Sequence, residues 1–109
     1  MLADDSIVRA NVMKGCVAKL RAAGAREIHI RVGSPPYMYP CYYGIDTSRI
    51  AGELAAARNN GEVEQIRREI GADSLAYLSL ERLKEAIACD SGLKFCDACF
   101  SGNYHIPVK

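Results

Sequence analysis

The chain has 109 residues, half of them hydrophobic, and this length suits one domain rather than two. Fourteen basic and thirteen acidic residues leave a formal net charge of +1, which gives no electrostatic basis for binding nucleic acid or an anionic membrane. No apolar run approaches the roughly 20 residues of a membrane-spanning helix, so we expect neither nucleic acid nor a membrane as a partner.

The first residues predict the end of a strand followed by a helix. Met1–Ala3 is a short apolar run, and Asp4 and Asp5 follow it directly. From Asn11 to Ala23 the apolar residues recur at helical spacing, and Gly24 then provides a C-terminal stop. These apolar positions are Met13, Cys16, Val17 and Leu20.

The middle of the chain predicts a strand, an irregular loop and two helices. Residues Glu27–Val32 alternate between apolar and polar, as in a strand. The next stretch, GSPPYMYPCYYGID at 33–46, holds three prolines and two glycines in fourteen residues, which predicts an ordered but irregular loop. Helices are expected over about Ser48–Ala57 and about Glu62–Ile70, the second closed by Gly71.

The last third predicts a strand and a helix before a tail. The apolar run at Ser74–Ser79 predicts the strand, and Ser79 can cap a helix. We expect three residues of this helix to face inward, namely Leu80, Leu83 and Ile87. The order of elements predicts an α/β fold with a parallel sheet and crossover helices. Three strands make a thin sheet, so we expect the chain to be the second part of a larger α/β domain.

The acidic pair is the first candidate site. In open α/β sheets, ligands bind at the carboxyl ends of the strands, where Asp4 and Asp5 stand. The loop behind them leads into a helix, whose free N–H groups and dipole attract an anion. Carboxylates beside such a loop suit a ligand that also carries sugar hydroxyls or Mg²⁺. The alternative is a solvated Asp-Asp pair that only caps the helix.

Several segments resemble one enzyme family, the amidophosphoribosyltransferases. DDSIVR at Asp4–Arg9 resembles the loop that binds phosphoribosyl pyrophosphate in that family. The stretches at Ala23–Asp46, Ile70–Ile87 and Cys96–Tyr104 resemble other segments of it, in the same order and with similar spacing. The SIVR that follows the acidic pair distinguishes this family from other phosphoribosyltransferases. The resemblance covers nearly the whole chain.

The resemblance implies the C-terminal portion of a type I phosphoribosyltransferase fold, with a partial parallel sheet, flanking helices and an irregular cysteine-containing tail. We therefore divide the chain into a partial phosphoribosyltransferase domain, 1–88, and a tail that packs on it, 89–109. The implied reaction transfers glutamine-derived ammonia to phosphoribosyl pyrophosphate and gives phosphoribosylamine and pyrophosphate, the first step of purine synthesis. The glutaminase domain of the family is missing, so we expect a fragment that is inactive alone and contains no catalytic residue.

The implied substrate-binding residues are Asp4, Asp5, Ser6, Ile7, Val8, Arg9, Ala10 and Asn11. Asp4 and Asp5 would also hold Mg²⁺. After Arg9 the family has Gly-Thr-Thr, whereas this chain has Ala10, Asn11 and Val12. Ala10 disfavours the positive φ that glycine allows, and Val12 lacks a hydroxyl donor. A non-catalytic binding or regulatory module with a degraded phosphate loop is therefore the alternative function.

The five cysteines are an odd number, which favours reduced thiols or metal thiolates in an intracellular protein. By itself the C-x-x-C at Cys96–Cys99 fits a zinc half-site, a redox pair or an accidental spacing. The family resemblance implies that Cys41, Cys96 and Cys99 are three of the four ligands of a [4Fe–4S] cluster. The fourth ligand comes from the glutaminase domain in that family, and no motif supports Cys89 or Cys16 as a substitute. The resemblance also implies a cytoplasmic enzyme that forms a homo-oligomer at full length.

Overall fold

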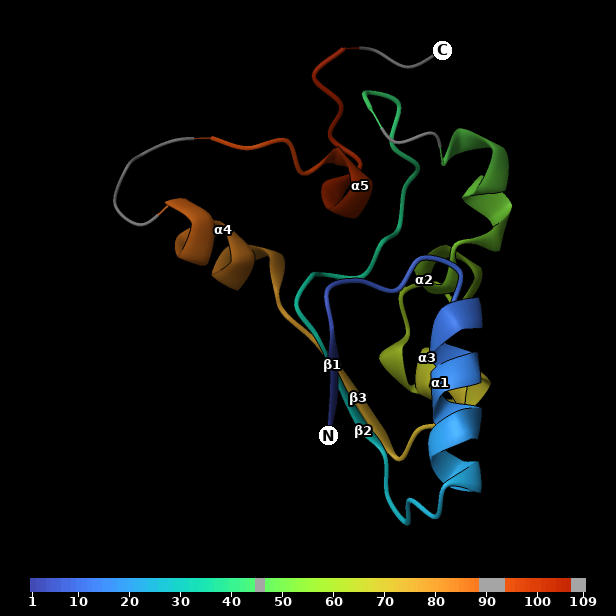
Figure 1. Cartoon of the computed structure of the whole chain (residues 1–109). Helices are drawn as coiled ribbons and strands as arrows, with labels where there is room; N and C mark the ends of the chain where they lie inside the picture. Colours follow the sequence, from blue (N-terminus) through green and yellow to red (C-terminus); the bar gives the residue numbers. More distant parts are fainter. Residues whose placement is uncertain (45–46, 89–93, 107–109) are drawn as a thin grey trace.

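The centre of the protein is a three-stranded parallel sheet. The computed structural model describes residues 1–44, 47–88 and 94–106. Its strands are β1 (Leu2–Asp4), β2 (His29–Val32) and β3 (Ser74–Tyr77), in the order β1-β2-β3 (Figure 1). Leu2 lies opposite Ile30, which lies opposite Leu75. The predicted α/β fold with a parallel sheet is confirmed, and the carboxyl ends of the strands share one edge.

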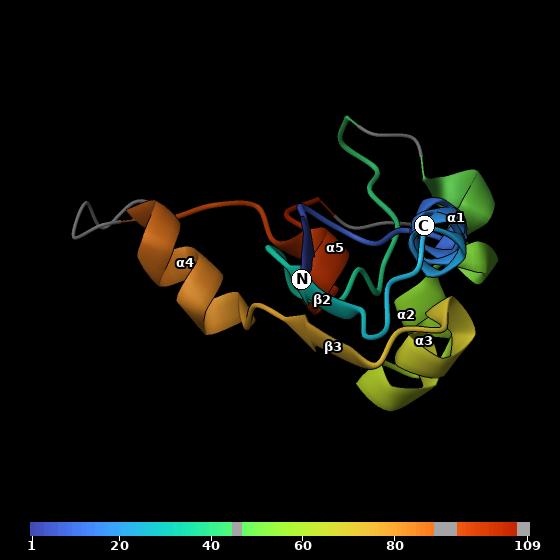
Figure 2. The same cartoon turned by 60° about the horizontal axis from the view of Figure 1, so that its bottom comes forward.

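Helices cover one face of this sheet. α1 (Asn11–Ala22), α2 (Ala55–Arg58) and α3 (Val63–Ile70) all lie on the same side of it (Figures 1 and 2). The core between helices and sheet includes Met13, Val17, Ile30, Val32, Ile66, Ile70 and Leu75. On the opposite face Ala3, Arg31 and Ala76 lie side by side in register and are exposed. The two-residue period of the strands therefore separates a buried face from an open one.

The helices α1 and α3 begin and end close to their predicted bounds. At the end of α3, Gly71 has a left-handed backbone with φ 87°, as expected for a glycine that closes a helix. On α1, Met13 and Val17 are buried and Cys16 is half-buried, but Leu20 is 37% exposed. Within the described part of the chain, no helix has the length and apolar character needed to cross a bilayer.

The prediction of one helix over Ser48–Ala57 is wrong. A 3-10 helix, η1 (Ser48–Glu53), is followed by α2, and the two meet at Leu54, whose backbone is extended (φ −61°, ψ 121°). The Leu54 side chain is 0% exposed. The N–H of Ala55 donates to the carbonyl of Val8 at 2.8 Å. A tertiary hydrogen bond and the burial of Leu54 therefore override the periodic pattern.

The helix α4 (Leu80–Ala88) is capped as predicted, because the N–H of Arg82 donates to Ser79 Oγ at 3.2 Å. Its apolar face does not enter the core. Leu80 and Leu83 are half-buried and Ile87 is 50% exposed. Among the described residues no element packs extensively on α4, so the expectation of an inward apolar face is wrong (Figure 2).

Candidate functional site

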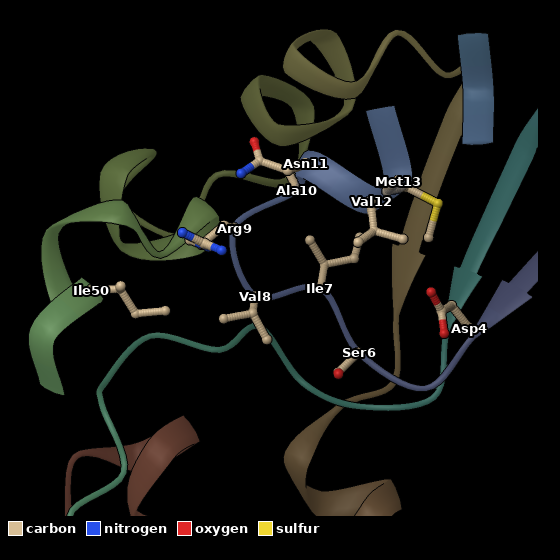
Figure 3. Close-up of a pocket in the computed structure, with 10 residues that line it drawn as sticks. All are labelled: Asp4, Ser6, Ile7, Val8, Arg9, Ala10, Asn11, Val12, Met13 and Ile50. Carbon is tan, nitrogen blue, oxygen red and sulfur yellow. The ribbon is translucent and has the colours of Figure 1, made fainter. Parts of the chain in front are cut away.

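The loop between β1 and α1 forms one wall of a pocket at the carboxyl edge of the sheet (Figure 3). The pocket has a volume of about 360 Å³. It is lined by Asp4, Ser6, Ile7, Val8, Arg9, Ala10, Asn11, Val12, Met13 and Ile50. The fold thus places a pocket at the position that the acidic pair and the following helix indicated.

Every predicted substrate-binding residue except Asp5 lines this pocket. Asp5 is exposed beside it, and its Oδ1 accepts a hydrogen bond from Ser6 Oγ at 3.3 Å. The N–H of Asp5 donates to Asp4 Oδ1 at 2.8 Å. Asp4 therefore borders the pocket while Asp5 stays outside its lining, and neither carboxylate forms an ion pair that the structure records in its described part.

The backbone at Ala10 keeps the left-handed conformation that its Cβ disfavours. Its φ is 73°, and the residue is only 4% exposed. This conformation costs an L-residue about 1–2 kcal/mol, so surrounding contacts must maintain it. Ala10 is also the N-cap of α1 and offers no side-chain cap. The first-turn N–H groups of α1 therefore face the pocket region without a capping side chain.

The pocket includes three residues that the sequence analysis did not select. Val12 and Met13 belong to the first turn of α1, and their place directly after the motif could have indicated them. Ile50 comes from η1, far along the chain. The residues around it in the sequence do not indicate that it lines a pocket. The pocket wall is consequently more apolar than the acidic motif suggested. Val12 itself is 77% exposed.

The cysteines implied as cluster ligands lie where the 33–44 loop meets the tail. Cys99 belongs to α5 (Ala98–Ser101), and its carbonyl accepts hydrogen bonds from the N–H groups of Met38 and Tyr39, both at 3.0 Å. Tyr104 Oη donates to the carbonyl of Pro40 at 2.7 Å. These bonds bring the segment before Cys41 against the C-x-x-C segment.

Burial raises the pKa of the Cys99 thiol, and the nearby Cys41 and Cys96 raise it further. A metal would therefore have to displace a proton from this thiol. In the residues that the structure describes, no three His, Cys, Asp or Glu side chains are already arranged to hold a metal ion. Cys89 lies outside the described residues, and Cys16 is half-buried on α1.

Two side chains anchor the cysteine segments to the rest of the fold. Thr47 is buried, and its Oγ1 accepts the N–H of Cys41 at 2.8 Å while it also hydrogen-bonds Tyr37 Oη at 3.0 Å. Lys84 Nζ lies 2.6 Å from Asp97 Oδ2, inside the C-x-x-C. The hydrogen bond from Lys84 holds the pKa of Asp97 below its usual range. The segment therefore stays tied to α4 at neutral pH.

No protein-family model matches the chain. Individual proteins do match it, and they share one name, amidophosphoribosyltransferase. The chain is 46% identical over 108 residues to the amidophosphoribosyltransferase of Methanothermobacter thermautotrophicus, covering 99% of this chain and 22% of that protein. It is 49% identical over 109 residues to a chloroplastic amidophosphoribosyltransferase 2 of Arabidopsis thaliana, covering 100% of this chain and 18% of the relative.

A solved structure supports the same relationship. The glutamine phosphoribosylpyrophosphate amidotransferase of B. subtilis, complexed with ADP and GMP, superposes with a TM-score of 0.82 and is 46% identical. The match covers 94% of this chain and 23% of that one. The chain thus spans about a fifth of the length of the relatives that it matches. By sequence and by fold, it is related to the amidophosphoribosyltransferases and corresponds to the C-terminal part of their phosphoribosyltransferase domain.

Proposed function

We propose that the pocket at the start of α1 binds the ribose and phosphate groups of phosphoribosyl pyrophosphate, as part of an amidophosphoribosyltransferase. The observation that carries the proposal is the convergence of Asp4, Ser6 and the uncapped first turn of α1 on one pocket. Carboxylates bind sugar hydroxyls, and the N-terminus of a helix binds phosphate. The left-handed Ala10 supports it further, because its φ of 73° lies in the region that glycine favours although a glycine is absent.

In the proposed reaction, glutamine-derived ammonia attacks the anomeric carbon and pyrophosphate leaves, giving phosphoribosylamine. Asp4 and Asp5 hold and orient the ribose hydroxyls. Two carboxylates also suit Mg²⁺, which usually shares its ligands with substrate phosphates and water. When bound, Mg²⁺ would neutralise the charge of the leaving pyrophosphate.

The chain alone is proposed to be inactive. It spans about a fifth of the length of its relatives, and this supports the proposal that a glutaminase domain and further strands of the sheet belong to polypeptide outside this chain. We propose that the complete enzyme is a cytoplasmic homo-oligomer. The alternative, a non-catalytic binding or regulatory module, is favoured by Val12, whose exposed isopropyl group offers no donor to a phosphate.

One experiment with two measurements tests this function. The purified chain is incubated with phosphoribosyl pyrophosphate, Mg²⁺ and ammonia, and we expect no pyrophosphate release. Calorimetric titration with ribose 5-phosphate and Mg²⁺ should show binding that disappears in the Asp4→Asn/Asp5→Asn variant. Binding that the double variant retains would contradict the assigned site. No binding by the unmodified chain would favour the alternative, and turnover would contradict the inactivity of the isolated chain.

We also propose that Cys41, Cys96 and Cys99 hold an iron–sulfur cluster weakly. Such clusters are held by four thiolates, and only three of the implied ligands belong to this chain. The hydrogen bonds of the Cys99 carbonyl to Met38 and Tyr39 support the proposal, because they bring the two ligand segments together. The alternative is that these are three reduced cysteines with no metal.

We expect labile, substoichiometric iron after anaerobic reconstitution, measured by visible absorption and iron analysis. Cys96→Ser or Cys99→Ser should remove it, because each leaves only two of the implied thiolates. Cys16→Ser is the matched control and should leave the iron content unchanged. Absence of iron in the unmodified chain, or loss with Cys16→Ser but not with Cys41→Ser, would show that the ligand assignment is wrong.

A further inference from the structure

Arg58, the last residue of α2, connects three separate parts of the chain. Its Nη2 donates to the carbonyl of Arg9 at 3.2 Å, and its Nε donates to the carbonyl of Glu53 at 3.1 Å. Its Nη1 lies 2.6 Å from Glu69 Oε1 on α3. One guanidinium therefore binds the loop before α1, the end of η1 and a carboxylate on α3.

Glu69 is the fixed partner in this arrangement, since its side chain is only 17% exposed. Asn59 Nδ2 donates to Glu69 Oε2 at 3.0 Å, and Lys14 Nζ lies 3.5 Å from Oε1. Burial alone would raise the pKa of Glu69. The hydrogen bonds from Arg58 and Asn59 outweigh burial and hold the pKa below its usual range. The carboxylate is therefore ionised at neutral pH and keeps Arg58 in place.

The loop that Arg58 contacts is also held by the burial of Ile7 and Ala10 in the core and by other polar contacts. Besides Arg58, the N–H of Ala55 bonds the carbonyl of Val8, and Arg9 pairs with Glu53 at 3.0 Å. The carbonyl of Arg9 belongs to the peptide group whose nitrogen is that of Ala10. Holding that carbonyl restricts rotation about φ of Ala10, which is the strained left-handed angle of 73°. The same peptide group sets the direction of the first turn of α1.

We propose that Arg58, held by Glu69, is a positioning residue for the pocket loop. It keeps the Arg9–Ala10 peptide in the conformation that aims the N-terminus of α1 into the pocket. Arg58 does not line that pocket itself; it lies in an adjoining polar cleft of about 240 Å³. The role in ligand binding rests on the proposed function, whereas the role in loop conformation can be measured without any ligand.

The test compares two conservative variants, Arg58→Lys and Arg67→Lys. A lysine at 58 can still pair with Glu69, but an ammonium cannot reach three acceptors as the planar guanidinium does. Arg67 is a matched control, because it also binds a glutamate and a carbonyl, Glu64 and Ala72, away from the loop. Brief trypsin treatment cleaves after Arg9 only when the loop opens, and mass spectrometry measures release of the peptide 1–9.

We expect Arg58→Lys to release peptide 1–9 about tenfold faster, since a hydrogen bond from a charged donor is lost from a locally opening segment. Arg67→Lys should leave this rate unchanged. Melting temperatures of both variants show whether global stability explains the result. Equal release rates for Arg58→Lys and the unmodified chain would overturn the proposal. So would a faster release in both variants that follows their melting temperatures.

Calorimetry with ribose 5-phosphate and Mg²⁺ separates this proposal from the proposed function. If the unmodified chain binds, Arg58→Lys should bind about tenfold more weakly, because small displacements of a positioned group reduce its effect strongly. Unchanged affinity would overturn the positioning role in binding. If the unmodified chain does not bind, the proposed function fails, and the proteolysis result still decides whether Arg58 fixes the loop.

Discussion

Ile30→Ala is expected to lower the free energy of unfolding by about 2–5 kcal/mol, the range for truncating a buried isoleucine. Ile30 is 0% exposed and occupies the central strand, with Leu2 on one side and Leu75 on the other. Domains of this size are stable by only about 5–15 kcal/mol, so a large part of the stability would be lost. In the described structure, no helix covers one face of this sheet. The apolar burial of the sheet is therefore concentrated on the face that includes Ile30, and little other burial can compensate for the truncated side chain.

Urea denaturation followed by circular dichroism measures this effect as a shift of the midpoint. Val12→Ala is the control, because Val12 is 77% exposed and its truncation should change the free energy of unfolding by less than about 0.5 kcal/mol. Similar midpoints for the two variants would contradict the assignment of Ile30 to the centre of the core.

Thr47→Val is expected to destabilise the chain by about 1–3 kcal/mol, although valine has nearly the same shape. Thr47 is 7% exposed, and its Oγ1 binds the N–H of Cys41 and the hydroxyl of Tyr37. Valine would leave both groups without this partner, in surroundings that are buried at Tyr37 and half-buried at Cys41. Because the Cys41 backbone would lose its anchor, the Cys41 thiol should also react faster with a thiol reagent.

Thr47→Ser keeps the hydroxyl and should restore most of the stability and the slow thiol reaction. Urea midpoints give the first quantity, and labelling of Cys41 followed by mass spectrometry gives the second. If valine and serine variants behave alike, the hydroxyl does not hold the loop, and packing of the Thr47 side chain explains its burial.

The strands and the main helices could be predicted because their patterns are local. The alternation in Glu27–Val32 and the glycine after Ile70 each determine a conformation from adjacent residues. The apolar face of α4 was equally clear in the sequence, but a pattern does not show whether another element covers that face. Ile87 therefore remains 50% exposed despite its helical spacing.

The pocket was predictable to the same extent. The strand end at Asp4 and the helix start at Asn11 are recognisable along the chain, but it was the resemblance of Asp4–Arg9 to a known loop that favoured a site there over a solvated acidic pair. Ile50 and Arg58 reach the loop only through tertiary contacts. The conformation of Ala10 was also beyond local rules, since its Cβ disfavours the angle that the surrounding hydrogen bonds maintain. Which ligand the loop accepts remains a prediction.

The break at Leu54 has a consequence for engineering this protein. In an uninterrupted helix the N–H of Ala55 would bond a carbonyl within that helix, and Val8 would lose its donor. Gly52 is a tempting site for a thermostabilising alanine, because a Cβ there would meet no atom within 4 Å. A mutation that straightened η1 and α2 would then remove this hydrogen bond from the loop between β1 and α1. Any gain in helix propensity at Gly52 therefore has to be weighed against the buried Leu54 side chain and the hydrogen bond from Ala55 to Val8, which both depend on the break.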